Sequence, residues 1–293
     1  MIEKYRKKAY PFEHIAVAVS FSPRLLAVLA EAFRVVQQFG ASRLIIIHIG
    51  VWTKDQQELL DKKIEEANIN DVAFELIHQE SKEVENSILA ICKENLVDLL
   101  IIGALKKENI FDYYMGSIAR NLSRTAKCCI LMLTEPKEKP VPFERIVVNG
   151  IENLKTIPTI ETALYIAEKE KANEIFVVRE VFLPLIDSGL CTDATGEESE
   201  GIKKEFLDEV ASKSDEEINK IEGFKDIIIK KRTIHGKPGY SIRNFSKSYK
   251  ADLLIINSSD KKMGFLDRVF THDLEHLLSR IPCNLLIVHS RRN

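Results

Sequence analysis

The sequence lacks several features that define large classes of proteins. Its 293 residues carry a formal net charge of only −2, so no overall field attracts nucleic acid or an anionic membrane. The apolar runs, such as that around residues 44–49, are far too short to cross a bilayer. The polar, basic segment 1–10 has no apolar stretch behind it, unlike a secretory signal. We therefore expect no nucleic-acid partner, no membrane association and no export.

Motifs for metal binding and covalent catalysis are also missing. The five cysteines include no Cys-x-x-Cys pair, and no Cys/His cluster has the spacing of a zinc site. There is no P-loop, no Gly-x-Gly-x-x-Gly and no recognisable nucleophile–base pair. The vicinal pair Cys128-Cys129 opens a predicted strand and is interpreted as two small buried hydrophobes. This cysteine usage favours a reducing, cytoplasmic setting.

The sequence does contain a long internal repeat. The segment Pro11-Phe12-Glu13-His14-Ile15 recurs as Pro142-Phe143-Glu144-Arg145-Ile146, and the sequence Asp-Leu-Leu-Ile-Ile occurs at both 98–102 and 252–256. A repeat of this length is a duplicated domain rather than a solenoid unit. We expect one domain at 1–136, a proline-rich linker at 137–142 and a second domain at 143–293. The second domain carries an insertion at about 181–224.

Short apolar runs alternate with amphipathic segments in both copies. In the first copy we expect strands at 15–19, 44–49, 72–78, 99–102 and 129–133, and helices at 22–39, 55–67, 84–95 and 118–125. Ser22 and Pro23 would cap and begin the first helix. The second copy repeats the order with a strand at 146–148, a helix at 160–169 and a strand at 174–178; a charged helix at 202–221 lies in its insertion.

Apolar strands separated by helices indicate βαβ units. The predicted fold class is α/β, with two tandem doubly wound domains. Each domain has a five-stranded, mainly parallel sheet with helices on both faces.

Candidate ligand-binding residues follow the strands, because ligands of open parallel sheets bind at the carboxyl ends of the strands. Ser20 follows the first strand, Ile49 ends the second and Gly103 follows the fourth. Lys106 comes three residues after Gly103. Nine more residues follow, and the pair Gly116-Ser117 then opens a predicted helix. A glycine permits close backbone approach, and free N–H groups at a helix start favour an anion. A phosphate group fits such a site.

At these residues the chain resembles the universal stress protein (UspA) family, and the duplication makes it look like a tandem member. The ATP-binding branch of that family carries Gly-x2-Gly-x9-Gly-Ser after the fourth strand and an aspartate after the first. Gly103, Gly116 and Ser117 match this pattern, whereas Lys106 replaces the middle glycine and Ser20 the aspartate.

The resemblance implies an adenine nucleotide alpha hydrolase-like fold with ATP or AMP bound to the first domain, and Mg²⁺ only with bound ATP. Gly103 and Gly116 would allow the phosphates to approach, and Ser117 would offer them a hydroxyl and an N–H group. Lys106 would act as a point-charge contact. Ser20 and Ile49 would flank the nucleoside.

The second copy matches the pattern poorly. Asn149 stands where the aspartate belongs, and Asn257-Ser258, Lys261 and Thr271-His272 occupy the loop positions. Gly264 lies in that loop but off the spacing of the motif. We therefore expect the second site to be closed or repurposed.

Two further segments are interpreted as structural. His48-Ile49-Gly50-Val51 is similar to the HIGH signature of adenylating enzymes, but it follows the second strand and lacks the closing histidine. The segment 235–239 aligns with 78–83, a strand-end loop that borders the ligand in the resembling family. A Gly/Pro turn entering a helix is the simpler interpretation of 235–239.

Three functions are compatible with these observations. The leading one is a cytoplasmic stress-response protein that binds an adenine nucleotide in its first domain. Enzymatic activity would be limited to slow, incidental ATP hydrolysis, because no positioned general base is visible. The alternative is a scaffold of the same family that binds no nucleotide and acts on an unknown protein partner. A true enzyme of the wider alpha-hydrolase-like group is third, since its HIGH and Ser-Gly-Gly type loops are missing.

The resemblance also implies how the two domains associate. Single-domain members of the family dimerise by pairing their final strands, and a tandem chain can do this internally. Residues 129–133 should therefore lie against residues 285–288 in an intramolecular pseudo-dimer, which would cover two apolar edges. Two whole chains could associate further as a homodimer.

Overall fold

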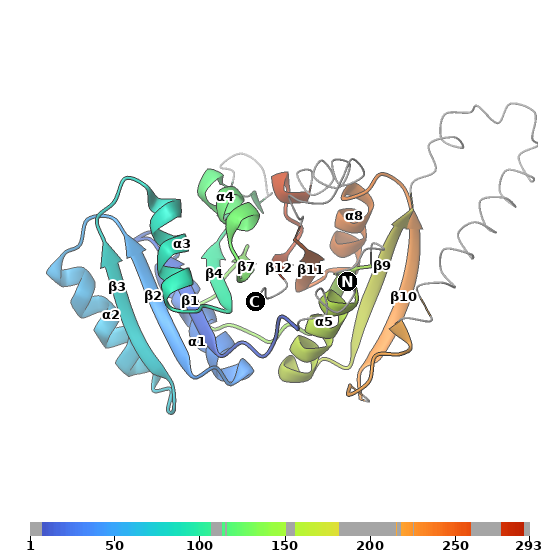
Figure 1. Cartoon of the computed structure of the whole chain (residues 1–293), viewed down its shortest axis with the longest axis horizontal. Helices are drawn as coiled ribbons and strands as arrows, with labels where there is room; N and C mark the ends of the chain where they lie inside the picture. Colours follow the sequence, from blue (N-terminus) through green and yellow to red (C-terminus); the bar gives the residue numbers. More distant parts are fainter. Residues whose placement is uncertain are drawn as a thin grey trace, which may run out of the picture.

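The computed structural model describes residues 8–106, 113–114, 116–150, 156–181, 215, 218–224, 226–258 and 277–289, and it contains two α/β halves lying side by side (Figure 1). The first half consists of β1 (His14–Val19), α1 (Leu25–Phe39), β2 (Arg43–Ile49), α2 (Lys54–Ala67), β3 (Ala73–Gln79), α3 (Val84–Glu94), β4 (Leu99–Gly103), β5 (Leu105–Lys106), β6 (Tyr113–Tyr114), α4 (Ser117–Thr125) and β7 (Cys129–Leu133). The second half consists of β8 (Ile146–Asn149), α5 (Thr156–Glu170), β9 (Glu174–Val181), β10 (Ile228–His235), α8 (Tyr240–Tyr249), β11 (Leu253–Asn257) and β12 (Asn284–Val288).

The longer strands form one sheet of ten, in the order β10-β9-β8-β11-β12-β7-β4-β1-β2-β3. Each half contributes five parallel strands in the same relative order, which confirms the predicted doubly wound α/β fold. The halves meet at β7 and β12, which pair antiparallel with Leu286 opposite Leu131. This is the predicted pairing of the final strands, and it leaves neither apolar edge exposed.

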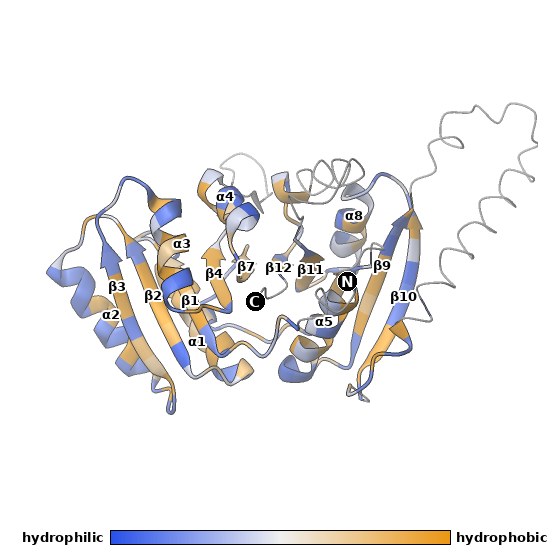
Figure 2. Ribbon diagram, viewed as in Figure 1, coloured by the Kyte–Doolittle hydropathy of each residue, from blue (hydrophilic) through white to orange (hydrophobic). Residues whose placement is uncertain are grey.

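The inner strands are apolar along their whole length because helices cover both faces of the sheet. In β2, residues 44–47 are at most 1% exposed. Figure 2 shows β2 and β4 as hydrophobic ribbons, whereas α2 on the outside alternates between hydrophobic and hydrophilic residues. Only Leu60 of α2 is buried, so this helix contributes a narrow apolar stripe.

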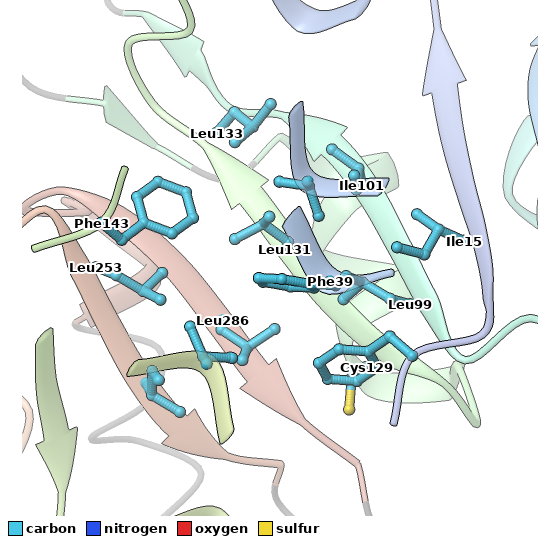
Figure 3. Packing of buried hydrophobic residues seen from close by; sticks show 14 of the residues in the cluster. Ile15, Phe39, Leu99, Ile101, Cys129, Leu131, Leu133, Phe143, Leu253 and Leu286 are labelled. Atoms are coloured by element: carbon cyan, nitrogen blue, oxygen red, sulfur yellow. The ribbon is translucent and has the colours of Figure 1, made fainter. Parts of the chain in front are cut away.

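Two hydrophobic cores lie on opposite faces of the sheet, and each extends through both halves. One core lies beneath α1 and α5 and includes Leu131, Leu253 and Leu286, which Figure 3 shows packed together across the seam. The other core contains residues of α3, α4 and α8, such as Ile88 and Ile242. The seam between the halves is therefore a packed interior.

Helices α1 and α5 also join the halves through a buried ion pair. Nη1 of Arg34 donates to both carboxylate oxygens of Glu170, at 2.8 and 2.7 Å, and Nε of Arg34 donates to Glu31 at 3.1 Å. The side chain of Glu170 is fully buried. Burial raises the pKa of Glu31 and of Glu170, although Arg34 opposes both shifts.

The two aspartates of the repeat occupy equivalent positions. Oδ2 of Asp98 accepts the backbone N–H groups of Glu13 and His14, at 2.9 and 3.0 Å. Oδ2 of Asp252 accepts the backbone N–H of Arg145 at 2.9 Å, and its carboxylate also pairs with the Arg145 side chain. Each aspartate thus ties the start of one strand to the start of its neighbour.

Some helix and strand limits differ from the prediction. The first helix begins at Leu25 rather than at Ser22-Pro23, so Ser22 is not its cap. The hydroxyl of Ser22 instead accepts from the N–H of Arg24 at 3.4 Å, and its carbonyl accepts from Leu25, which makes a turn before the helix. Helix α5 begins a turn earlier than predicted, because Pro158 is tolerated in a first turn. Strand β9 continues three residues further, to Val181.

The connections add one unpredicted feature, the short β5–β6 hairpin after β4. No helix or strand lies between Leu133 and Ile146, all of whose residues are described, where the linker is predicted. The insertion, with its predicted helix at 202–221, lies largely outside the described residues. Cys128 and Cys129 are buried, as expected, and neither takes part in a disulfide. In the part of the chain that is described, no helix is both long and apolar enough to span a membrane.

Candidate functional site

A cavity of about 570 Å³ lies where β1 and β4 end. These strands are neighbours, but β1 leads to β2 on one side and β4 leads to β7 on the other. The cavity is therefore at the switch point of the sheet, where doubly wound folds bind their ligands. Its volume falls within the range of about 300–1,000 Å³ typical of small-molecule sites. The lining consists of Ala18, Val19, Ser20, Ser22, Pro23, Arg24, Leu25, Val28, Ile88, Ile102, Gly103, Ala104, Leu105, Gly116, Ser117, Ile118, Ala119 and Leu122.

Four of the predicted binding residues line this cavity together. Ser20 directly follows β1, Gly103 ends β4, and Gly116 and Ser117 begin α4. Gly116 is the N-cap of α4 and Ser117 is its first residue, and no side chain among the described residues caps that helix. The unpaired N–H groups of a helix start favour an anion at this edge of the cavity.

The remaining two predicted residues are not part of the lining. Ile49 ends β2, is partly buried and packs against the core that contains α3 and α4. Lys106 lies in β5, and its side chain is outside the described part of the structure. The assignments of Ile49 and Lys106 to a ligand remain predictions.

Sequence reasoning missed Arg24, which contributes the cavity's positive charge. Among the described residues of the lining, Arg24 alone is charged. Its guanidinium donates to the carbonyls of Ala104 and Thr134, which follow β4 and β7. A signal was present, since Arg24 comes four residues after Ser20 at the same edge of the sheet. The prediction treated that segment only as a helix start.

Leu105 shapes the phosphate side of the cavity. A Cβ added to Gly116 would lie 2.6 Å from Cδ1 of Leu105, so the missing side chain leaves room for the leucine. A Cβ added to Gly103 would lie 3.7 Å from Cγ2 of Val28, an ordinary contact. The side chain of Leu105 thus occupies the space that a Cβ at Gly116 would need. At Gly103, by contrast, the surrounding atoms leave enough room for a Cβ.

Four aromatic rings cluster at the ends of β1, β2 and β3, next to Ser20. Trp52 stacks on His78 with ring centroids 4.8 Å apart, and Phe21 lies edge-on to both His48 and Trp52. The ring nitrogens of His48 lie 3.2 Å from the carbonyls of Val19 and Val51. His48 therefore fixes the loop after β2, in agreement with its interpretation as a structural residue.

The register of the second half corrects the role of Asn149. Ile15 pairs with Leu44 and Leu99 in the first half, and Ile146 pairs with Ile175 and Leu253 in the second. Counting from this common register, Asn149 corresponds to Ala18 and not to Ser20. Strand β8 has four residues where β1 has six, and the prediction matched strand ends instead of strand starts. The counterpart of Ser20 lies outside the described residues.

The alignment of 235–239 with 78–83 is also wrong. His78 pairs with His48, whose counterpart in the second half is Arg179, and Arg179 pairs with Thr233. His235 therefore lies two positions beyond the counterpart of His78. The segment forms a turn before α8, as the simpler interpretation held.

In the second half, the carboxylate of Glu180 binds the start of α8. Oxygens of Glu180, the counterpart of Ile49, accept the N–H groups of Gly239 and Ile242 at 2.9 and 2.8 Å. A carboxylate at the end of an otherwise apolar strand was the signal for this contact. Ser258 donates its N–H to Val288 as Ala104 does to Leu133. Lys261, Gly264 and Thr271-His272 lie outside the described residues.

Comparison with known proteins identifies the first domain. Residues 11–134 match the model of the Universal stress protein family. A putative universal stress protein from Pseudomonas aeruginosa UCBPP-PA14 aligns over 94% of this chain and 93% of its own, with 15% identity and a TM-score of 0.63. One from Archaeoglobus fulgidus DSM 4304 aligns over 96% and 97%, with 13% identity and a TM-score of 0.57. A search of curated protein sequences finds no significant match.

The first domain therefore belongs to the universal stress protein family, and the resemblance predicted from its residues is confirmed. The structural alignments extend through the second half, so that half has the same fold. The chain as a whole has the architecture of a tandem universal stress protein.

Proposed function

We propose that the chain is a cytoplasmic stress-response protein whose first domain binds an adenine nucleotide, ATP or AMP. The observation that carries this proposal is the cavity at the switch point, which gathers Ser20, Gly103, Gly116 and Ser117. Arg24 adds a fixed positive charge to the same space. Together they provide hydroxyl groups, helix N–H groups and a guanidinium, which are the usual partners of phosphate.

In this proposal the phosphates lie between Arg24 and the start of α4. Ser117 offers a hydroxyl, and Gly103 allows the strand end to approach. The nucleoside lies toward Ser20 and Ile49, with Lys106 as an additional phosphate contact. Mg²⁺ would arrive with ATP and be held by its phosphates, because the lining includes no carboxylate from the part of the chain that the structure describes.

We propose no enzymatic role beyond slow, incidental hydrolysis. The lining of the cavity contains no Asp, Glu or His among the described residues, so it offers no general base to activate water. Bound nucleotide would accordingly act as a signal or a structural ligand.

One observation favours the alternative, a scaffold that binds no nucleotide. The side chain of Leu105 occupies the space at Gly116 where a phosphate would approach the helix start. Leu105 is 51% exposed, so it can move aside for a ligand, but it also makes an apolar surface for a protein partner. The two functions differ in whether the purified protein retains nucleotide.

The first test is to denature freshly purified protein, identify released nucleotides by mass spectrometry and titrate the stripped protein with AMP, ATP and ATP with Mg²⁺. We expect about one adenine nucleotide per chain. Absence of both released nucleotide and measurable binding would favour the scaffold.

A charge variant locates the site. Gly116→Asp brings a carboxylate to the phosphates and should weaken ATP binding at least about tenfold. Ser42→Asp adds the same charge just before β2, at the amino ends of the strands and so on the side of the sheet away from the cavity. This variant should leave binding unchanged. Equal loss in both variants, or loss in neither, would contradict the assignment.

A further inference from the structure

The cavity has two chemically different regions. Its mouth consists of the exposed residues Ser20, Ser22, Pro23, Leu105, Ser117 and Ile118. Its floor consists of residues that are at most 9% exposed, namely Val19, Leu25, Val28, Ile88, Ile102, Ala104, Ala119 and Leu122. The polar side chains of the lining are thus confined to the mouth and to Arg24.

The floor offers no side-chain hydrogen bond to a ligand. The carbonyl of Ala104 already accepts from Arg24, and the N–H of Ala104 donates to Leu133. A base edge, a ribose hydroxyl or a phosphate oxygen placed on the floor would lose its water without gaining a partner. An apolar group placed there loses nothing and gains burial.

The mouth has the opposite preference. The guanidinium of Arg24 donates to two carbonyls and brings a positive charge to the cavity, and the lining contains no carboxylate among the described residues. The start of α4 contributes the positive end of a helix dipole beside Ser117. An anionic group is therefore favoured within reach of Arg24.

We infer that the ligand of this cavity carries an apolar chain as well as a phosphate: the phosphate binds at Arg24 and Ser117, and the chain fills the floor. This inference rests on the proposed use of the cavity as the ligand site of the first domain. A simple alkyl phosphate and an alkyl ester of AMP share the required chemistry. The exposed side chains of Leu105 and Ile118 extend the apolar surface to the mouth.

Two homologous series test the inference by calorimetric titration, below the micelle-forming concentration. One series is butyl, hexyl and octyl phosphate, and the other is the same alkyl esters of AMP. Full burial strengthens binding about fourfold for each methylene. In one series we expect the affinity to rise at least about twofold for each added methylene. The rise should stop at the chain length that fills the floor of the cavity. Affinity independent of chain length in both series would overturn the inference.

Variants connect the effect to the floor. Ala119→Leu fills part of it and should end the gain at a shorter chain, whereas Thr125→Leu, on the same helix outside the cavity, should not. Arg24→Gln should weaken every member of a series by a similar factor and leave the gain for each methylene unchanged. If Ala119→Leu folds normally by circular dichroism and does not shift the limiting length, the chain is not on the floor and the inference fails.

The results separate this inference from the proposed function. Binding of AMP and ATP without a chain-length effect would retain the nucleotide and reject the apolar chain. A chain-length effect for alkyl phosphates without any binding of nucleotides would do the reverse. A gain in the AMP esters alone would support both and identify the nucleotide ester as the ligand class.

Discussion

The two halves of the molecule share one strand register but use the carboxyl ends of their strands differently. In the first half, His48 and Ile49 end β2 beside an open cavity. In the second half their counterparts are charged. Arg179 is 3% exposed and pairs with Asp215, and Glu180 binds the start of α8. Glu180 thus satisfies the start of α8, which corresponds to α3 of the first half, whereas the counterpart of the start of α4 lies outside the described residues.

At the amino ends of the strands, and along the seam between β7 and β12, the two halves are alike. Asp98 and Asp252 bind the chain before the neighbouring strand in the same way. The cores continue from one half to the other. Stability should therefore depend on features that both halves share, whereas ligand binding depends on one edge of the first half. Substitutions at each kind of position test that division.

The seam should give the largest effect. Ile287 of β12 lies opposite Ile130 of β7, and both are 0% exposed. Ile287→Asp would bury an unpaired carboxylate there, and we expect a loss of more than about 4 kcal/mol of unfolding free energy, enough to unfold many domains. Urea denaturation followed by circular dichroism measures the loss.

The matched control for the seam is the outer edge of the sheet. Ile228 begins β10 and is 59% exposed, so Ile228→Asp should change stability by no more than about 0.5 kcal/mol. Similar stability of the two variants would mean that the halves do not depend on the β7–β12 contact.

The ion pair between α1 and α5 should have the next largest effect. Arg34→Met leaves the carboxylate of Glu170 buried without its partner, and the expected loss is about 3–5 kcal/mol near neutral pH. Replacing Arg34 and Glu170 together with Met should restore part of that stability, since the unpaired charge of Glu170 is then removed, while buried Glu31 still lacks Arg34. Urea denaturation of the wild type, the single variants and the double variant completes the cycle.

The pH dependence of Arg34→Met has a defined sign. Burial raises the pKa of Glu170 above its ordinary value of 4.5, and removing Arg34 raises it further. A raised carboxyl pKa in the folded state lends stability at low pH that is lost as pH rises through it. The loss in the Arg34→Met variant should be small at about pH 4.5 and grow toward neutral pH. A loss that is constant with pH would show that Glu170 is not the group responsible.

The sequence predicted the sheet better than it predicted the site, because the two depend on different ranges of contact. The apolar run 44–49 and the repeated Asp-Leu-Leu-Ile-Ile segment are local patterns, and such patterns sufficed for the strands and the fold class, whereas the β7–β12 seam was predicted from the family resemblance. Arg24 binds carbonyls that are 80 and 110 residues away, so its position in the cavity is not visible in its neighbours. The contact of Leu105 with Gly116 depends on an unpredicted hairpin.

Asn149 shows a second limit of sequence comparison. Its resemblance to a strand-end aspartate was a local pattern, but β8 is two residues shorter than β1. Only hydrogen-bonded pairing fixes which residues correspond, because a strand can be shortened at either end without changing its apolar pattern.

The two repeated aspartates should give a smaller and unequal effect. Asp98→Ala removes the acceptor of two backbone N–H groups, and we expect a loss of roughly 1–3 kcal/mol. Asp252→Ala removes one such bond and a pair with Arg145 whose side chain is 45% exposed, so its loss should be smaller. A larger loss for Asp252→Ala, measured by urea denaturation, would show that the ion pair with Arg145 is worth more than an exposed pair usually is.

The smallest effects on stability should come from glycines at the carboxyl ends of the strands, where the two halves differ most. A Cβ at Gly150 would lie 2.7 Å from Cγ1 of Val177 and 3.3 Å from the carbonyl oxygen of Val178, so Gly150→Ala should cost about 1 kcal/mol. Gly103→Ala meets only Val28 at an ordinary 3.7 Å and should be neutral or slightly stabilising, because alanine restricts the unfolded chain. Thermal denaturation of both variants measures the difference. A cost at Gly103 equal to that at Gly150 would mean that the strand ends of the first half are packed as closely as those of the second, and that its cavity is tighter than the spacing around Gly103 indicates.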